Sequence, residues 1–192
     1  MLKNWVAFSS LTTTRKTTSE IGRVISIASL QSVGGIRVPT FGTLCYLRYR
    51  NRVLLLKKEK GLFGEGKWNA PGGKLFGAEP PEKGAVREML EETGLRVSGL
   101  HFHGLLDFYL GRNRKLDLVV FVFSSERYTG RLKRSREGEL RWFSIDQLPY
   151  QEMWEDDPKW LPLLLKGRNF IGDFCFSDNY GVLVDHKIHL MP

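Results

Sequence analysis

The segment that most constrains this chain is VREMLEETG, residues 86–94, which places three glutamates within about one turn of a predicted helix. Positions i, i+3 and i+4 of a helix share one face, so Glu88, Glu91 and Glu92 converge along one edge. Two like charges about 5 Å apart repel by roughly 3 kcal/mol at an effective dielectric near 20. This edge therefore needs something that offsets the repulsion.

The residues around this segment delimit the helix. Proline suits a first helical turn, where N–H groups lack partners in any case, so Pro80-Pro81 predicts the start. Gly94 supplies the left-handed residue that ends a helix, and Leu95 supplies the apolar contact that follows it. The apolar contacts of the helix are expected from Ala85, Val86, Met89 and Leu90.

Two interpretations account for the crowded carboxylates. A divalent cation would remove the repulsion, and carboxylate oxygens are hard ligands that suit Mg²⁺ or Mn²⁺. Alternatively, the helix is an ordinary exposed one whose charges are balanced by i,i+4 pairs such as Arg87–Glu91. The three glutamates alone leave both interpretations open, so the flanking residues must decide between them.

The flanking residues complete a longer pattern. Gly73 is followed after five residues by Glu79, and after seven more by REMLEETGL, residues 87–95. This segment resembles the Nudix box, G-x5-E-x7-R-E-U-x-E-E-x-G-U with U aliphatic, and every fixed position is filled. The chain is thereby identified as a member of the Nudix hydrolase family. The resemblance implies an α+β fold, an α/β/α sandwich with a mixed sheet, whose loop–helix–loop binds divalent cations. It also implies hydrolysis of a nucleoside diphosphate derivative by attack of water on phosphorus.

The same resemblance implies roles for the charged residues of the box. Glu88 and Glu92 would be the principal metal ligands, with Glu91 an additional one. One of these glutamates would orient or deprotonate the attacking water. Arg87 would anchor the carboxylates through charge-assisted hydrogen bonds, and Glu79 would support Arg87 rather than bind metal.

Positions outside the helix are expected to complete the metal site. A backbone carbonyl at Gly72 or Gly73 could do so, because glycine lets the chain approach a metal closely. Glu137, in SREGELRWF, matches a glutamate outside the box that approaches the metals, and Glu139 is near enough in sequence to compete. The alternative for Glu137 is a solvated loop charge. The expected cofactor is Mg²⁺, with Mn²⁺ as a substitute, acting as Lewis acid, water activator and template.

Two further stretches resemble the MutT-like branch of the family, the 8-oxo-dGTP diphosphatases: GEGKWNAPGGK, residues 64–74, and MWEDDPKWLPLLLKGRNF, residues 153–170. In that branch an asparagine and two adjacent aspartates read the base while a tryptophan stacks on it. The matching positions are Asn69, Asp156, Asp157 and Trp154. The chemistry agrees, since carboxylates accept from the N–H groups of an oxidised guanine, an amide both donates and accepts, and an indole offers a π-face. The adjacent aspartates would titrate as a coupled pair.

Other positions match or adjoin nucleotide contacts of that branch: Thr43, Lys58, Phe63, Gly72, Gly73 and Lys74. Several of the base-reading positions also have purely structural interpretations. Trp154 could be a core anchor beneath a C-terminal helix. Asp156-Asp157 before a proline could cap that helix, and Asn69 could satisfy a turn.

The expected activity is Mg²⁺-dependent hydrolysis of oxidised purine nucleoside triphosphates, 8-oxo-dGTP first, to the monophosphate and pyrophosphate. The alternatives are another Nudix substrate, such as a dinucleoside polyphosphate, a capped RNA or ADP-ribose, and a non-catalytic module that senses a nucleotide. Pro71 stands where the mammalian member of the MutT-like branch has an aromatic residue, and Glu155 stands where it has proline. Both differences bear on base preference. The net charge is +8, but the basic segments are not interleaved with aromatic residues as in an RNA-binding signature. The expected partner is therefore a nucleotide substrate, with no stable nucleic-acid partner, and the expected state is a monomer.

Residues 1–36 differ in composition from the remainder, predicting an N-terminal extension before a single domain at residues 37–192. They are rich in Ser and Thr, basic and nearly free of acids, which fits an organellar transit peptide, a disordered tail or a misassigned start. No apolar run approaches the roughly 18 to 20 residues of a membrane span. A cytoplasmic protein is expected, with organellar targeting as the alternative. Cys45 and Cys175 are expected to be free thiols.

Strands dominate the expected secondary structure, with about two helices inserted. The expected strands are residues 40–49 and 52–57 as a hairpin, 69–76, 100–110, 116–124, 140–143 and a pair after residue 170. The expected helical segments are the one between Pro81 and Gly94, a turn at residues 145–148 and a helix at residues 160–166.

Overall fold

The helix predicted from the glutamate-rich segment is present as α1 (Pro81–Thr93) in the computed structural model, which describes residues 32–33 and 36–192. Its end has the predicted cause: Gly94 has a φ of 78°, and its N–H donates to the Leu90 carbonyl at 2.9 Å. Leu95 follows as a buried apolar residue. The prediction for the N-terminal extension lies mostly outside the described residues.

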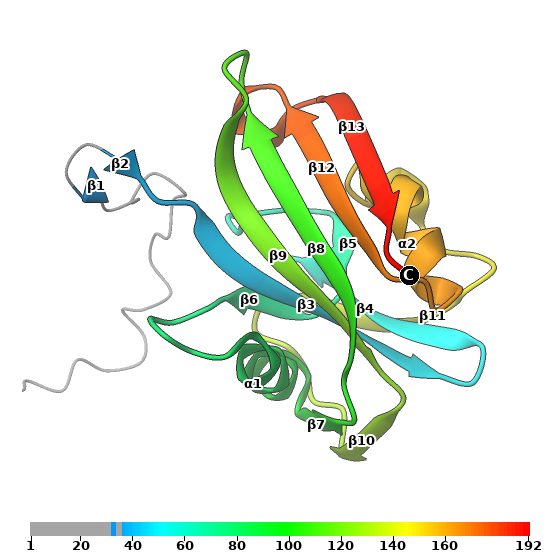
Figure 1. The fold of residues 1–192 in the computed structure, drawn as a ribbon. Helices are drawn as coiled ribbons and strands as arrows, with labels where there is room; N and C mark the ends of the chain where they lie inside the picture. The colour runs from blue at the N-terminus through cyan, green and yellow to red at the C-terminus, as the bar shows by residue number, and fades with distance from the viewer. Residues whose placement is uncertain (1–31, 34–35) are drawn as a thin grey trace, which may run out of the picture.

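A mixed nine-stranded sheet forms the body of the described chain (Figure 1). Its strand order is β11-β4-β3-β9-β8-β12-β13, and β5 and β6 attach to β4 and β3. The pairs β3–β9 and β8–β12 are parallel and the other pairs are antiparallel. The strands are β3 (Thr40–Tyr49), β4 (Arg52–Lys58), β5 (Trp68–Asn69), β6 (Gly72–Lys74), β8 (His101–Leu110), β9 (Lys115–Ser125), β11 (Gly138–Ser144), β12 (Phe170–Phe176) and β13 (Leu183–Leu190).

Smaller elements complete the described structure. They are the paired strands β1 (Ser32–Val33) and β2 (Ile36–Arg37), the paired strands β7 (Leu95–Ser98) and β10 (Arg127–Gly130), the helix α2 (Asp157–Leu165), and two 3₁₀ turns, Tyr150–Glu152 and Asp178–Tyr180. No helix in the described part of the chain is long and apolar enough to cross a membrane. Both cysteines are buried free thiols.

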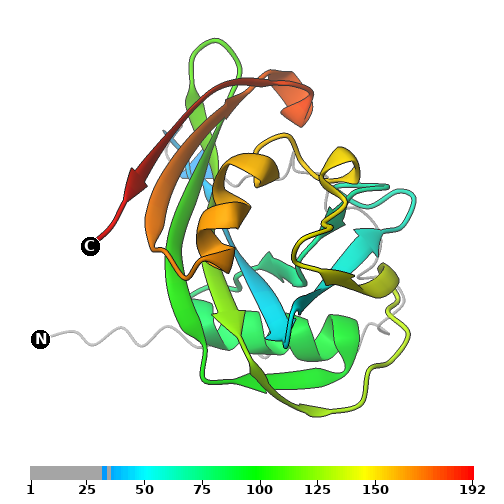
Figure 2. The same ribbon diagram turned by 90° about the vertical axis from the view of Figure 1, so that its right-hand side faces the viewer.

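Strands β3 and β4 separate beyond their hairpin, and this separation positions the site. They pair directly only near the turn, at Arg48↔Val53 and Tyr49↔Arg52. Farther along, β6 pairs with β3 and β5 pairs with β4. The segment from Asn69 to Gly72 thus connects the two diverging strands, and Gly72 contacts Glu92 near the C-terminal end of α1. Helix α1 lies at the lower side of the molecule in both views (Figures 1 and 2).

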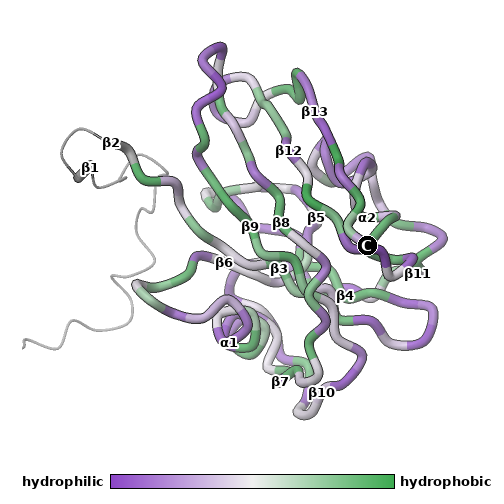
Figure 3. The backbone as a smooth tube through the Cα atoms, viewed as in Figure 1, coloured by the Kyte–Doolittle hydropathy of each residue, from purple (hydrophilic) through white to green (hydrophobic). Residues whose placement is uncertain are grey.

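Alternation along the strands produces two apolar cores on opposite faces of the sheet. On β3, Tyr46 belongs to the core that packs against α2, and Cys45 belongs to the core that packs against α1. Trp160 of α2 and Met89 of α1 are each fully buried in these cores. The apolar stretches of the strands contrast with the hydrophilic turn between β8 and β9 (Figure 3). The α+β sandwich is confirmed.

Some element boundaries differ from the prediction. The expected strand at residues 69–76 is two short strands, because Ala70-Pro71 interrupts the pairing before β6 begins at Gly72. The expected helical turn at residues 145–148 is a non-helical turn, and a 3₁₀ turn follows it. Helix α2 begins at Asp157 rather than Trp160, with Pro158 in its first turn. The β7–β10 pair was not predicted.

Candidate active site

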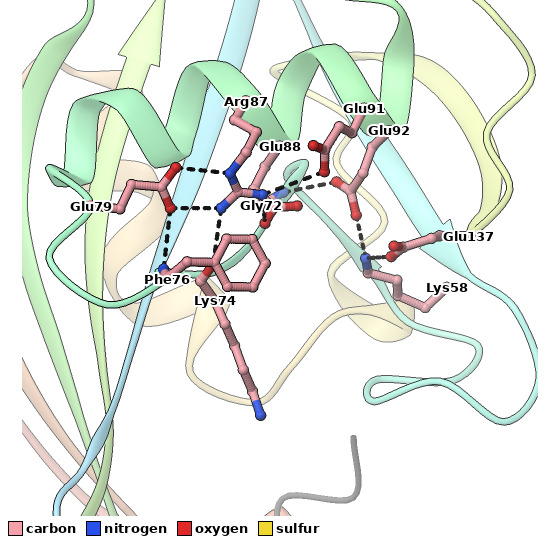
Figure 4. A network of polar contacts seen from close by, with 10 residues as sticks. All are labelled: Lys58, Gly72, Lys74, Phe76, Glu79, Arg87, Glu88, Glu91, Glu92 and Glu137. Carbon is pink, nitrogen blue, oxygen red and sulfur yellow. Dashed lines mark hydrogen bonds and ion pairs between the residues drawn. The ribbon is translucent and has the colours of Figure 1, made fainter. Parts of the chain in front are cut away.

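The carboxylates of α1 are held by cations from two directions (Figure 4). Arg87 donates from Nε and Nη2 to the two Glu79 oxygens, both at 2.8 Å, and from Nη2 to the Lys74 carbonyl at 3.1 Å. Its Nη1 donates to Glu88 at 2.6 Å and lies 3.4 Å from Glu91. One guanidinium therefore fixes the loop before α1 to two of the three crowded glutamates.

The third glutamate, Glu92, is almost fully buried and makes contacts outside the helix. Its Oε2 accepts the Gly72 backbone N–H at 2.8 Å, and its Oε1 accepts Lys58 Nζ at 2.6 Å. Lys58 also contacts Glu137 at 2.5 Å. The ammonium group of β4 thus lies between carboxylates from α1 and from the segment before β11, residues that the sequence separates widely.

Burial controls the ionisation of this cluster. Burial raises the pKa of Glu92 to about 8, against the opposing charge of Lys58. Burial also raises the pKa of Glu88, although the Arg87 hydrogen bond lowers it. For Glu137 the effect of burial is outweighed by hydrogen bonding with Glu92 and by the charge of Lys58, so its pKa is lowered. A nearby cation stabilises the ionised form of such buried carboxyl groups.

The donor chemistry of the cluster suits a hard divalent cation. The available ligands are carboxylate oxygens and backbone groups. Two cationic side chains, Lys58 and Arg87, already lie against these oxygens, so positive charge is stabilised at this place. In the described residues no three acidic, His or Cys side chains converge around one point closely enough to hold a metal ion, and Lys58 lies against both Glu92 and Glu137. Glu91 is exposed, and its one polar side-chain contact among the described residues is the long one to Arg87, at 3.4 Å.

Gly73 leaves the space that Glu88 occupies. A Cβ at this position would lie 2.6 Å from the Glu88 carboxylate, closer than real contacts allow. At Gly72 a Cβ would lie 2.1 Å from the Thr43 carbonyl. Gly72 is therefore required by the close approach of β6 to the backbone of β3, whereas a side chain at position 73 would displace the Glu88 carboxylate. Lys74 contributes its carbonyl to Arg87, and its side chain extends away from the cluster (Figure 4).

We expect Gly73→Ala to reduce turnover about tenfold or more, because the methyl group displaces the Glu88 carboxylate while the backbone conformation remains accessible to alanine. Steady-state kinetics on the purified variant, beside circular dichroism and thermal unfolding, measure this. Gly181→Ala is the comparison, since Gly181 has a φ of −69° that alanine adopts, and a Cβ there would first meet the flexible Ser177 hydroxyl, at 3.0 Å. Full activity of a folded Gly73→Ala protein would contradict the steric assignment.

The adjacent aspartates lie in the protein interior, at the start of α2. Asp156 and Asp157 are only 3% and 1% exposed. Asp156 Oδ2 accepts the Trp160 indole N–H at 2.8 Å, and Asp157 Oδ2 accepts the Trp154 backbone N–H at 2.9 Å. Asp156 occupies the N-cap position of α2, as the capping interpretation expected, but it makes no side-chain cap hydrogen bond.

Burial raises the pKa of both carboxyls. Burial raises the pKa of Asp156 to about 6, and the Trp160 hydrogen bond lowers it in part. Burial and the charge of Asp156 raise the pKa of Asp157 well above its ordinary value. Near neutral pH the pair therefore presents both a carboxylate acceptor and a protonated carboxyl donor.

We expect Asp157→Asn to raise the thermal unfolding midpoint at pH 8 by a few degrees and to leave it nearly unchanged at pH 4. The native pKa is raised, so the native state holds a proton that the unfolded chain releases above about pH 4, and stability from this group is lost as pH rises. Asparagine removes that loss and keeps an oxygen for the Trp154 N–H. Calorimetry over this pH range, with the exposed Asp146→Asn as control, provides the measurement. A difference that does not grow with pH would contradict it.

An aromatic group lies beside the aspartates. The rings of Phe63 and Trp154 are 5.2 Å apart and tilted by 30°, and Tyr180 contacts both at 5.3 and 6.0 Å. Lys67 Nζ lies 5.1 Å from the Trp154 ring and donates to the Met153 carbonyl. Phe63 is 47% exposed and Trp154 is half-buried against the α2-side core, whereas Trp160 is a core residue. These rings offer π-faces at the protein surface.

Asn69 and Thr43 occupy the strands between the two groups. Asn69 Oδ1 accepts the Tyr46 hydroxyl at 3.1 Å and the Ala70 N–H at 2.7 Å. Thr43 is 2% exposed, pairs in register with Gly73, and its hydroxyl has no partner in the described structure. An unpaired buried hydroxyl is consistent with a contact supplied by a ligand.

Sequence reasoning missed three residues that the structure places here. Tyr180 has a left-handed backbone, with φ of 57°, and its hydroxyl donates to buried Asp117 at 3.0 Å. Its unfavourable conformation presents a ring to Phe63, which no sequence pattern indicates. Lys67 and Tyr46 were missed because a lysine in a loop and a tyrosine in a strand are common. Only the tertiary structure shows that the Lys67 ammonium group lies over the Trp154 ring and that its charge lowers the pKa of Asp156.

Comparison with known proteins agrees with this arrangement. The profile of the NUDIX domain matches residues 37–164. The chain is 42% identical over 147 residues to an oxidized purine nucleoside triphosphate hydrolase from Danio rerio, covering 76% of this chain and 92% of that protein. It is 42% identical over 142 residues to one from Mus musculus, covering 73% and 89%. A crystal structure of a MutT protein from Bacillus halodurans superimposes with a TM-score of 0.70 at 27% identity, covering 78% of this chain and 97% of that one. The filled Nudix box, the fold and these relatives together show that the chain belongs to the Nudix hydrolase family.

Proposed function

We propose that this protein hydrolyses oxidised purine nucleoside triphosphates, 8-oxo-dGTP first, to the nucleoside monophosphate and pyrophosphate. The observation that carries the proposal is the proximity of two chemically distinct groups. The carboxylate cluster around Glu92 contacts Gly72, and the base-reading residue Asn69 lies only three residues earlier in the chain. Three residues span at most about 11 Å, a distance within the reach of one nucleotide.

The base end of the site has the groups that an oxidised purine needs. Such a base presents N–H donors and carbonyl acceptors on its edge. The Asp156–Asp157 pair supplies an acceptor and a donor, and the Asn69 amide supplies a further polar group. Trp154 and Phe63 supply the π-faces. The two relatives at 42% identity, which are oxidized purine nucleoside triphosphate hydrolases, favour the same substrate class.

The phosphate end has the groups that phosphoryl chemistry needs. Members of the family generally need a divalent metal, and we propose Mg²⁺ here, with Mn²⁺ as a substitute, held by Glu88, Glu92, Glu91, Glu137 and the Gly72 carbonyl. When bound, the metal supplies Lewis acidity and charge neutralisation at the phosphates. Phosphoryl transfer depends mostly on positioning and electrostatic stabilisation rather than on covalent catalysis by the protein.

The chain's own residues then perform distinct tasks. Arg87 holds the carboxylates of Glu88 and Glu91 in place and is itself held by Glu79. A carboxylate of the cluster orients the attacking water and accepts its proton, and the Glu91 side chain is more exposed to solvent than that of Glu137. Lys58, a cation beside Glu92, is placed to contact an anionic phosphate. The water oxygen forms a bond to a phosphorus of the α–β phosphate bridge, and the bond between that phosphorus and the bridging oxygen breaks. The products are the nucleoside monophosphate and pyrophosphate.

The decisive experiment compares 8-oxo-dGTP with dGTP under saturating Mg²⁺, and measures pyrophosphate release by the purified protein. We expect kcat/KM to be at least about tenfold higher for the oxidised nucleotide, since the base pocket reads groups that dGTP lacks. A panel including a dinucleoside polyphosphate, a capped RNA and ADP-ribose accompanies it. Equal rates on 8-oxo-dGTP and dGTP, or faster turnover of a panel member, would reject the proposed substrate while leaving the family assignment intact.

A further inference from the structure

The orientation of the Asn69 amide is fixed by the protein before any ligand binds. Its Oδ1 accepts the Ala70 backbone N–H at 2.7 Å. A backbone N–H can only donate, so the amide atom that faces it must be the oxygen. The Tyr46 hydroxyl, 3.1 Å from the same oxygen, must then be a donor. Both lone pairs of Oδ1 are used by protein groups.

The Nδ2 end of the amide is left for a ligand. It makes no hydrogen bond to another residue in the described part of the chain, although Asn69 is partly buried. A half-buried amide nitrogen without an acceptor is costly unless water or a ligand supplies one. Asn69 therefore presents a donor, and not an acceptor, to whatever binds beside the aspartates.

The Tyr46 side chain that donates to Asn69 is held by the surrounding core. It is fully buried, and its ring packs edge-on against Trp160 at 5.7 Å. Trp160 in turn donates to Asp156. Burial, with the nearby charges of Asp157 and Asp156, raises the pKa of Tyr46 well above its ordinary value, so the hydroxyl stays a donor throughout the working pH range. The same core thus orients both an amide and a carboxylate of the base pocket.

We propose that Tyr46 is a positioning residue for substrate selection: it locks the Asn69 amide with Nδ2 toward the bound base, and thereby favours purines with a 6-oxo group over purines with a 6-amino group. A 6-oxo group accepts a hydrogen bond from Nδ2. A 6-amino group would place two donors against each other. The inference rests on the proposed function, because it concerns the base end of that site.

The test uses 8-oxo-dITP and 8-oxo-dATP, whose bases differ at position 6 (oxo or amino) and consequently at N1, which carries a proton only in 8-oxo-dITP. The N1 difference is the same for wild type and variant, so a change in preference on mutation reports on position 6. We expect wild-type protein to prefer 8-oxo-dITP. Tyr46→Phe removes the hydroxyl and keeps the ring, so we expect KM for 8-oxo-dITP to rise about five- to tenfold with kcat within twofold. The preference over 8-oxo-dATP should shrink by a similar factor. Tyr49→Phe is the matched control, since the Tyr49 hydroxyl has no hydrogen-bond partner in the described structure and its ring packs on Tyr128 and Trp142.

A double-mutant cycle separates positioning from general loss of structure. In an Asn69→Ala background, Tyr46→Phe should change neither KM nor the preference, because the amide that it orients is gone. Thermal unfolding of all four proteins shows whether each is folded. An equal effect of Tyr46→Phe on both nucleotides, or the same effect with and without Asn69, would overturn the inference. If wild-type protein hydrolyses neither 8-oxo nucleotide, the proposed function fails instead.

Discussion

Replacing Glu92 by glutamine should lower Mg²⁺-dependent turnover by about 10²–10³-fold while the protein stays folded. Glu92 connects the helix, β6 and β4, because its two oxygens contact the Gly72 N–H and the Lys58 ammonium. Glutamine keeps the shape and one oxygen for Gly72, so we expect the fold to survive. It loses the second anionic oxygen, which metal binding and charge neutralisation require.

Two measurements accompany this prediction. Calorimetric titration with Mg²⁺ or Mn²⁺, with and without a nucleotide, should show weaker metal uptake by Glu92→Gln. Glu82→Gln is the matched control, since Glu82 lies in the first turn of the same helix and is exposed. If Glu92→Gln retained wild-type kcat and metal affinity, the assignment of Glu92 as a ligand would be untenable.

The second large effect is expected at the other end of the site. Asp156→Asn together with Asp157→Asn should lower kcat/KM for 8-oxo-dGTP by at least about 100-fold. At neutral pH the pair offers an ionised acceptor, since the pKa of Asp156 is raised only to about 6. Two asparagines remove that acceptor and place amide donors against the N–H groups of the base. Buried and mismatched donors reject a ligand strongly.

The predicted loss is limited to base recognition. The double variant should keep the metal affinity of wild type, because neither aspartate contacts the carboxylates of α1 in the described structure. Asp173→Asn, in the partly exposed position of β12, is the control for removing a carboxylate. Unchanged kcat/KM on 8-oxo-dGTP in a folded double variant would remove the aspartates from base recognition.

The contrast between these two ends of the site shows where sequence reasoning succeeds. The helix of the Nudix box could be predicted to its last residue, because a proline start, a left-handed glycine and helical spacing are local properties. The β3–β4 hairpin and the β8–β9 pair were predicted for the same reason. The boundaries of α2 and the broken strand at Ala70-Pro71 depended on tertiary contacts, and the prediction there was wrong.

Charge partners within one helix were also accessible from the sequence, whereas those between elements were not. The Arg87–Glu91 spacing predicts an ion pair, and the two groups lie 3.4 Å apart. Nothing in the sequence indicated that Lys58 would lie between Glu92 and Glu137, which come from segments 34 and 79 residues away from it. The assigned roles of these residues remain predictions that the variants above test.

By itself, the sequence determined the α+β class, the glutamate-bearing helix and the family, because these follow from short-range spacing and residue chemistry. Only the tertiary structure decided which carboxyls are buried, which hold protons, and which way the Asn69 amide faces. Those properties depend on solvent exclusion and on hydrogen-bond donors that arrive from distant strands, such as Tyr46 and Trp160. Local spacing cannot encode them, since they exist only once β3, β5 and α2 have packed together.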